Sequence, residues 1–373
     1  MKLHFNIISI VILILSTLFF SCTKKSSDEY IIGVAVPFSG QEGAATYGKN
    51  IKQACELAAD EINKTGGISG RKIKLVYEDT KLIPSISVDA VTKLSTVDRV
   101  DIIIGDVASS STIACSKVVE QYKTILISPA STSHEISGIS KYVFRTIAPD
   151  TYEGEAMAEF CKNKGYRKVA ICYVDNAGTK GPALIFKKKY EEFGLEVPTF
   201  EVLSQGSTDA RTQMTKLISS KPDAVYLLGY ALELGTMIKQ FREQDKLLPI
   251  FSFQVMEEPK VREIAGLSAE GVIFTTPTIY EDLASGKSRN FIEKYKAVYT
   301  DPPGIFSANA YDAIYIIKYC IDKVGFDKEK IRSELSQISN FEGASGNFSI
   351  NKNGDSDQKP FLMIVREGKI VKY

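Results

Sequence analysis

Short apolar runs and helix-spaced apolar positions alternate along most of this chain. The first run is typical of a buried strand and comprises Ile31, Ile32, Val34 and Val36. After a loop rich in Pro, Ser and Gly, apolar residues recur at helical spacing, at Ile51, Ala54, Cys55, Ala58 and Ile62. Gly66 and Gly67 end this helix, because glycine adopts the left-handed C-terminal conformation without steric cost. The pattern predicts a strand–helix–strand unit whose first loop lies where open α/β sheets bind ligands.

The same order recurs in two sets of elements. In the first set we predict strands at 31–36, 72–78, 101–104, 124–127 and 142–145 and helices at 47–63, 85–97, 110–121 and 132–136. In the second set we predict strands at 168–174, 197–202, 224–228, 249–252 and 271–275 and helices at 151–164, 179–193, 208–219 and 231–244. Helices at 287–299, 306–323 and 327–336 and a strand at 361–366 follow. This alternation predicts an α/β fold with two parallel, helix-covered sheets.

The composition excludes some partners. Of the 373 residues, 46 are basic and 45 acidic, and residues 1–21 contribute only Lys2 to these counts. A chain balanced in this way has no electrostatic footprint for nucleic acid, and it gives no reason to expect a strongly charged substrate. We therefore expect no nucleic-acid partner.

Residues 1–22 are predicted to be a targeting segment rather than part of the fold. Lys2 precedes a mostly apolar run that is short for a membrane-spanning helix, and Ser21-Cys22 follows it. This ending resembles a bacterial lipobox, with Phe19 where leucine is usual, so we expect Cys22 to carry a lipid. A simple membrane anchor is the alternative. Residues 23–29 are too polar to pack and are predicted to be a tether.

The remaining cysteines give no metal or redox motif. They are Cys55, Cys115, Cys161, Cys172 and Cys320. None lies in a C-x-x-C pair or at a zinc-ligand spacing, and an odd number leaves at least one free thiol. Buried free thiols, which behave as small apolar groups, are the expected state. A bridge between Cys161 and Cys172 is the alternative.

Catalytic motifs are not found. His134 is the one histidine after the targeting segment, and the nucleophile-elbow and zinc-protease patterns are missing. Residues 43–50 nearly match a phosphate-binding loop, but Asn50 replaces the hydroxyl residue that would hold Mg²⁺. We therefore predict no catalytic residue, no metal and no cofactor.

Two hydroxyl-rich loops follow adjacent predicted strands. Four consecutive residues, Ser109, Ser110, Ser111 and Thr112, open a helix, and a second group around Ala130 and Thr132 follows the next strand. Helix N-termini carry unpaired N–H groups and favour anions. Serine at this position is also a common N-cap, but capping requires one hydroxyl rather than four. The loops together predict a cradle for a carboxylate.

Several segments resemble a known family. They are GVAVPFSG at 33–40, the Tyr47-Gly48 pair, ADEINKTGGISGRKI at 59–73 and FEGASGNFSINKNGD at 341–355. These segments resemble type I periplasmic solute-binding proteins, specifically the branched-chain amino-acid-binding proteins of ABC importers. The resemblance implies two doubly wound parallel-sheet lobes joined by a three-strand hinge. It places one lobe at 30–147 plus 277–356 and the other at 148–276 plus 357–373.

The resemblance also implies a ligand site between the lobes. Residues matching Ser109, Ala130 and Thr132 hold the ligand's α-carboxylate, with Ser110 beside them. Positions matching Tyr47, Tyr230 and Phe306 form an aromatic wall, which is typical of small-ligand clefts.

Two positions depart from the family on the side that holds the ligand's amine. Gln254 stands where an acid usually pairs with the ammonium, and Thr179 replaces a tyrosine. A desolvated ammonium without a counter-charge is costly, so we infer a ligand with a carboxylate or polar acceptor head and no α-ammonium. Two alternatives stay open: Glu257 or Glu258 replaces the missing acid, or Lys180 reaches the cleft and favours an anion.

The expected function is ligand capture for an ABC importer, by hinge closure and without chemistry on the ligand. The ligand would be a small amino acid or a related carboxylate or amide. The expected partners are the importer's membrane subunits, and the protein is expected to be a monomer in the cell envelope, attached to the membrane by lipid alone. A ligand sensor, or a lipoprotein that activates a cell-wall enzyme, is the alternative on the same fold.

Overall fold

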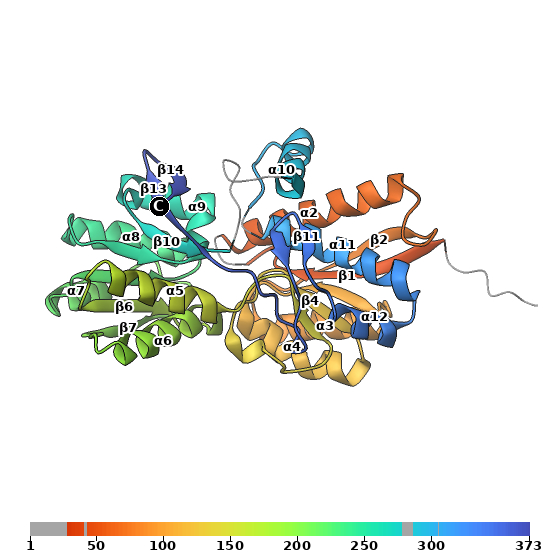
Figure 1. Ribbon diagram of the computed structural model, residues 1–373, viewed down its shortest axis with the longest axis horizontal. Coiled ribbons are helices and arrows are strands. Elements are labelled where there is room, and N and C mark those ends of the chain that lie inside the picture. Colours follow the sequence, from red (N-terminus) through yellow and green to blue (C-terminus); the bar gives the residue numbers. More distant parts are fainter. Residues whose placement is uncertain (1–27, 41–42, 278–285, 305) are drawn as a thin grey trace, which may run out of the picture.

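The computed structural model describes residues 28–40, 43–277, 286–304 and 306–373. Cys22 and the predicted targeting segment lie outside the described residues, as does most of the predicted tether. The chain forms two α/β lobes that lie side by side (Figure 1). None of the helices in the described ranges combines the length and the apolar character needed to span a bilayer.

The first sheet has the strand order β2-β1-β3-β4-β5, and all of its strand pairs are parallel. Its strands are β1 (Glu29–Val36), β2 (Lys72–Asp79), β3 (Ile102–Gly105), β4 (Ile125–Ser128) and β5 (Val143–Arg145). The apolar runs of β3 and β4 are fully buried, as expected for parallel strands that are covered by helices on both faces. All five strands lie within about two residues of the ranges predicted from the sequence.

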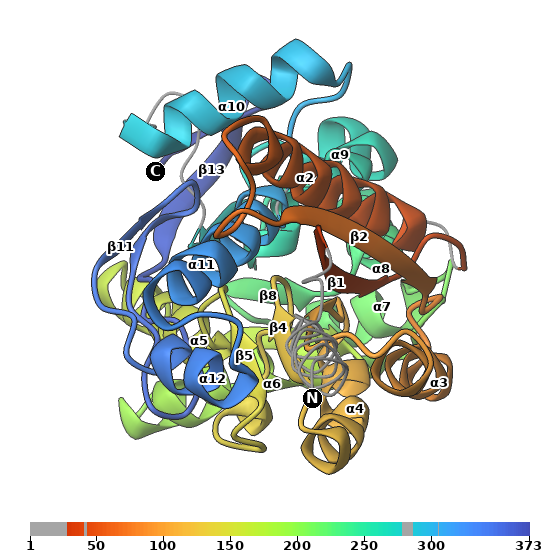
Figure 2. The ribbon, with the colours of Figure 1, turned by 90° about the vertical axis from the view of Figure 1, so that its right-hand side faces the viewer.

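Helices cover both faces of this sheet (Figure 2). On one face α2 (Ala44–Lys64) packs against α11 (Ser307–Val324), and on the other α3 (Pro84–Thr96) packs against α4 (Ser109–Tyr122). Three further helical segments belong to this part of the structure: η1 (His134–Ile136), α10 (Gly286–Val298) and α12 (Lys328–Leu335). A short hairpin of β11 (Phe341–Gly343) and β12 (Gly346–Phe348) was not predicted from the sequence.

The second sheet has the order β14-β13-β10-β9-β8-β6-β7. Its parallel strands are β6 (Val169–Val174), β7 (Phe200–Leu203), β8 (Ala224–Leu228), β9 (Ile250–Ser252) and β10 (Ile273–Thr276). The helical segments around it are α5 (Asp150–Asn163), α6 (Ala177–Glu192), α7 (Arg211–Ser219), α8 (Ala231–Gln244), η2 (Gln254–Glu257), α9 (Pro259–Ala265) and η3 (Gly266–Ala269). The predicted parallel, helix-covered sheets are thus confirmed for both lobes.

One edge of the second sheet differs from the expected parallel pattern. β13 (Phe361–Arg366) pairs antiparallel with β10, and β14 (Lys369–Lys372) pairs antiparallel with β13. The turn between them is Glu367-Gly368, where both residues have positive φ, at 51° and 70°. Two positive φ values match the twist of a two-residue hairpin. The second strand of this hairpin was not predicted, because it has only four residues.

The chain passes between the two sheets three times, after β5, after β10 and before β13. The first and third passages lie against each other, since the backbone N–H of Arg145 donates to the carbonyl of Gly354 at 2.9 Å. These passages run between the lobes in Figure 1. The residue bounds of the two lobes stay a prediction.

Candidate ligand-binding site between the lobes

The two hydroxyl-rich loops of the first lobe are brought together as predicted. The Ser109 hydroxyl accepts a hydrogen bond of 3.1 Å from the backbone N–H of Ser133, and the hydroxyls of Thr112 and Ser131 lie 2.8 Å apart. The N-cap of α4 is Ala108, and no side chain caps this helix. Simple N-capping therefore does not account for the serines. Ser109, Ala130 and Thr132 are all buried at the carboxyl ends of β3 and β4.

A buried arginine that was not predicted from the sequence as part of the site holds the second loop in place. Arg145 ends β5, and its Nη1 donates to the carbonyls of Ser131 and Ser133 at 3.3 and 2.8 Å. Its Nε donates to Oδ1 of Asp355 at 2.8 Å. The guanidinium thus binds the carbonyls of the residues on both sides of Thr132. It also connects this loop to Asp355, on the third passage between the lobes. Its signal in the sequence is a lone charge at the end of an apolar strand.

A short series of hydrogen bonds connects the second lobe to these loops. Asn176 caps α6 by accepting a hydrogen bond of 3.0 Å from the N–H of Gly178, and its Nδ2 donates to the hydroxyl of Ser110 at 3.0 Å. The hydroxyl of Tyr230 donates to Oδ1 of Asn176, also at 3.0 Å. The lobes therefore touch at the predicted site. Asn176 was not selected from the sequence, because an asparagine before a helix is a common cap.

The three predicted aromatic residues form one buried group. The ring of Tyr47 lies 5.5 Å from that of Phe306 and 6.3 Å from that of Tyr230, measured between centroids. Next to Tyr47, Gly48 lets helix α2 pack closely against the loop after β1, because a Cβ there would lie 1.8 Å from the carbonyl oxygen of Pro37. The group places an apolar wall beside the hydroxyl loops.

Thr179 and Gln254 have different surroundings on the amine side. The hydroxyl of Thr179 lies 2.5 Å from the carbonyl oxygen of Val174 and 3.0 Å from that of Asn176, so it is engaged in the local β6–α6 turn. Gln254 starts η2 directly after β9 and is 2% exposed, and its Oε1 has no hydrogen-bond partner among the residues that the structure describes. On the amine side, the amide oxygen of Gln254 is therefore a buried acceptor without a donor among the described residues.

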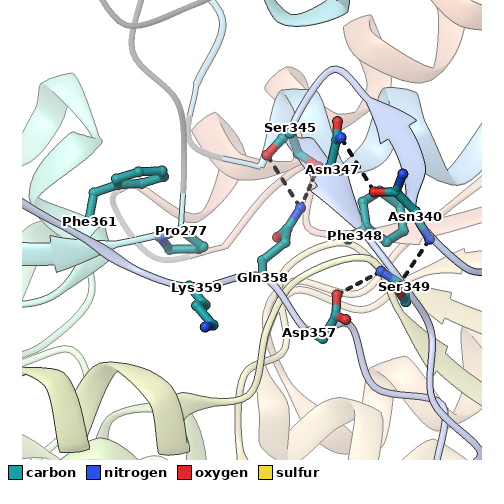
Figure 3. Close-up of a pocket in the computed structure, with 11 residues that line it drawn as sticks. Pro277, Asn340, Ser345, Asn347, Phe348, Ser349, Asp357, Gln358, Lys359 and Phe361 are labelled. Atoms are coloured by element: carbon teal, nitrogen blue, oxygen red, sulfur yellow. Dashed lines mark hydrogen bonds between the residues drawn. The ribbon is translucent and has the colours of Figure 1, made fainter.

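A separate hollow lies at the hinge (Figure 3). It has a volume of about 350 Å³ and is lined by the β11–β12 hairpin together with Pro277, Gln358, Lys359 and Phe361. The Nε2 of Gln358 donates to the hydroxyl of Ser345 at 2.7 Å across one wall. Since the hollow borders two of the passages between the lobes rather than the strand ends, it is distinct from the predicted site.

The described residues contain no group of three His, Cys, Asp or Glu side chains placed to hold a metal ion. Two α/β lobes joined by three passages, with a buried cradle of hydroxyls and aromatic rings where their strand ends meet, define a hinged solute-binding protein. Comparison with known proteins agrees with this class. The chain belongs to the periplasmic binding protein family, whose profile matches residues 29–369, and it is of the type I, branched-chain amino-acid ABC importer type.

Individual relatives extend this finding. The chain is 30% identical over 339 residues to a leucine-, isoleucine-, valine-, threonine- and alanine-binding protein of Pseudomonas aeruginosa, covering 90% of this chain and 89% of the relative. The leucine-binding protein LivK of Thermotoga maritima is 30% identical and superposes with a TM-score of 0.87, over 92% of this chain and 97% of LivK. A Rhodopseudomonas palustris solute-binding protein in complex with benzoate is 22% identical, with a TM-score of 0.85 over 92% of this chain and 95% of that one. This last likeness concerns the fold alone.

Proposed function

We propose that this protein is a lipid-anchored, extracytoplasmic solute-binding protein that delivers a small amino acid, or a related carboxylate or amide, to an ABC importer. The observation that carries the proposal is the meeting of the Ser109 and Thr132 loops with the Asn176–Tyr230 edge of the other lobe. Hydroxyl and N–H donors at the start of α4 suit a ligand carboxylate. The aromatic group of Tyr47, Tyr230 and Phe306 suits an apolar ligand side chain.

The first test is calorimetric titration of the chain from residue 23 onward with leucine, isoleucine, valine, threonine and alanine, with their deaminated acids and with the amides of those acids. Thr132→Val keeps the shape of the side chain and removes its hydroxyl. Hydrogen bonds to charged groups contribute about 1.5–3 kcal/mol, so this variant should bind about 10- to 100-fold more weakly. Thr96→Val, on α3 away from the lobe interface, is the matched control and should bind as the parent does. If the parent binds no member of the panel, the proposed function is wrong.

The lipid anchor has its own test. Cys22→Ala should release the full-length protein from the membrane fraction of cells that express it, and it should abolish incorporation of a labelled fatty acid. Retention of Cys22→Ala in membranes would favour a simple peptide anchor instead.

A further inference from the structure

A buried acid, Asp106, supports both hydroxyl-rich loops of the first lobe. It directly follows β3, lies three residues before Ser109 and is 1% exposed. Its carbonyl oxygen accepts a hydrogen bond of 2.7 Å from the hydroxyl of Ser128 and lies 3.1 Å from the hydroxyl of Ser131. The hydroxyl of Ser128 in turn accepts hydrogen bonds from the N–H groups of Ala130 and Ser131, at 3.2 and 2.9 Å. The backbone of Asp106 therefore joins the loop that begins α4 to the loop that follows β4.

These loops lie at the surface where the two lobes meet. A Cβ on Gly178, in the first turn of α6, would lie 3.0 Å from the hydroxyl oxygen of Ser109 and 3.4 Å from the phenol oxygen of Tyr230. Burial raises the pKa of Tyr230, and the charges of Glu233 and Asp106 raise it further. The charge of Asp106 therefore acts across the lobe interface, and it would act on a ligand carboxylate held at Ser109.

The contacts of the Asp106 side chain suit a neutral carboxyl group. Its Oδ1 accepts hydrogen bonds from the hydroxyl of Thr80 at 3.2 Å and from the backbone N–H of Val107 at 2.5 Å. Its Oδ2 lies 2.5 Å from the hydroxyl oxygen of Ser87, which also lies 3.0 Å from the carbonyl oxygen of Ile83. A hydroxyl has one proton and cannot donate fully to two acceptors. A proton on Asp106 resolves this, because the carboxyl group then donates to Ser87 and Ser87 donates to Ile83.

The charges around Asp106 also favour the neutral form. Burial raises the pKa of Asp106 to about 6, although hydrogen bonds, of which that from Ser87 is the strongest, oppose the rise. In the described part of the chain no lysine, arginine or histidine nitrogen lies within ion-pair distance of this carboxyl group. The titratable groups that face it are Cys115 on α4 and Tyr230 from the second lobe, and burial raises the pKa of both, so they are uncharged. A ligand carboxylate would add a like charge, which further disfavours ionised Asp106.

We propose that Asp106 is a positioning residue of the ligand site that takes up a proton when the ligand's carboxylate binds between the two loops. The proton removes the repulsion between two negative charges, and the neutral carboxyl group keeps the contacts with Thr80, Ser87 and Val107 that hold the loops in place. The proposal rests on the proposed function and deepens it. Capture of a carboxylate ligand becomes tighter as the pH falls, because binding and protonation favour each other.

The test is calorimetric titration with leucine, or with the tightest-binding acid of the first panel if leucine does not bind. Titrations in buffers of different ionisation enthalpy give the number of protons taken up per ligand. Four proteins are compared: the parent, Asp106→Asn, Asp101→Asn and His134→Gln. Asp106→Asn has the shape of the neutral acid, and its amide N–H can donate to Ser87. Asp101, partly exposed at the other end of β3, is the matched control, and His134 titrates in the same pH range.

The parent should take up about 0.4 proton or more per ligand at pH 7 and should bind about fourfold or more tightly at pH 6 than at pH 7.5. Asp106→Asn should lose this uptake and bind more tightly than the parent at pH 7.5. Asp101→Asn and His134→Gln should both keep the uptake, and the latter decides the assignment if Asp106→Asn does not fold.

Three results would overturn the proposal while leaving a solute-binding protein intact. They are no proton uptake by the parent, unchanged uptake or weaker binding at pH 7.5 in folded Asp106→Asn, and loss of uptake in His134→Gln. Binding of the amides alone would also overturn it, because no carboxylate would then enter the site. Binding of no member of the first panel would overturn the proposed function and this proposal with it.

Discussion

The phenol oxygen of Tyr47, on the first lobe, accepts a hydrogen bond of 3.1 Å from the backbone N–H of Ala231, the first residue of α8 on the second lobe. The first N–H groups of a helix have no partner within the helix. The side chain of Tyr47, from the opposite lobe, therefore accepts the hydrogen bond of this N–H group. When the lobes separate, the N–H group would be hydrated instead. Closure of the lobes thus forms a hydrogen bond to Tyr47, which belongs to the aromatic group at the proposed ligand site.

Tyr47→Phe should weaken ligand binding by making the closed form less favourable. The change leaves the N–H of Ala231 buried without an acceptor, which costs about 1–3 kcal/mol and corresponds to an affinity loss of about 5- to 100-fold. Titration with the tightest-binding member of the panel gives this loss, and small-angle scattering of the loaded protein should show a larger radius of gyration. Tyr152→Phe, at a partly exposed tyrosine on α5, should change neither measurement. Unchanged affinity in Tyr47→Phe would mean that this bond contributes nothing to closure.

Arg145→Met should destabilise the protein strongly. The change leaves Asp355 buried without its cation and frees the carbonyls of Ser131 and Ser133. Loss of one member of a buried pair costs about 3–5 kcal/mol, which urea unfolding would measure. Asp301→Asn breaks the ion pair with Lys49, in which both side chains are more than half exposed, and should cost less than about 1 kcal/mol. Similar losses in the two variants would contradict the structural role given to Arg145.

Stability should increase as the pH falls from 7 to 5. Burial raises the pKa of Asp106 and of Asp312 to about 6, although hydrogen bonds partly oppose this. Below pH 6 the folded state holds protons that the unfolded chain, with ordinary carboxyl pKa values near 4, does not bind. Folding is therefore favoured by about 1 kcal/mol for each group at pH 5 relative to pH 7.

Urea unfolding at pH 7 and pH 5 measures this difference, and Asp312→Asn provides the control. The variant loses hydrogen bonds from the N–H groups of Ala344 and Ser345, so it should be less stable at both pH values. Its difference between the two pH values should nevertheless be smaller than that of the parent. A parent protein that is more stable at pH 7 than at pH 5 would refute the assignment.

The five described cysteines should not react with a thiol reagent in the folded protein. Cys55, Cys115, Cys161, Cys172 and Cys320 are free and fully buried, and burial raises the thiol pKa of each. Both burial and a raised pKa suppress the reactive thiolate. In the chain from residue 23 onward, which lacks Cys22, a reagent added in denaturant should titrate five thiols. Three thiols in denaturant without reductant would reveal the alternative bridge between Cys161 and Cys172.

Much of the fold could be read from the sequence because its signals are local. A strand such as β3 is an unbroken apolar run, and helix α2 shows its buried stripe at helical spacing. The Ser109 and Thr132 loops could be found in the same way, since each directly follows such a run. The short elements near the C-terminus, β11, β12 and β14, were missed because three or four residues carry too little periodicity.

The sequence by itself determined the order of most strands and helices and the position of the two hydroxyl-rich loops. Only the tertiary structure decided which distant residues meet. Arg145 joins Asp355 across 210 positions, and Tyr47 joins Ala231 across 184. The physical reason is that periodicity records which face of an element is buried, whereas partners across the lobes depend on sheet order and on how the lobes approach.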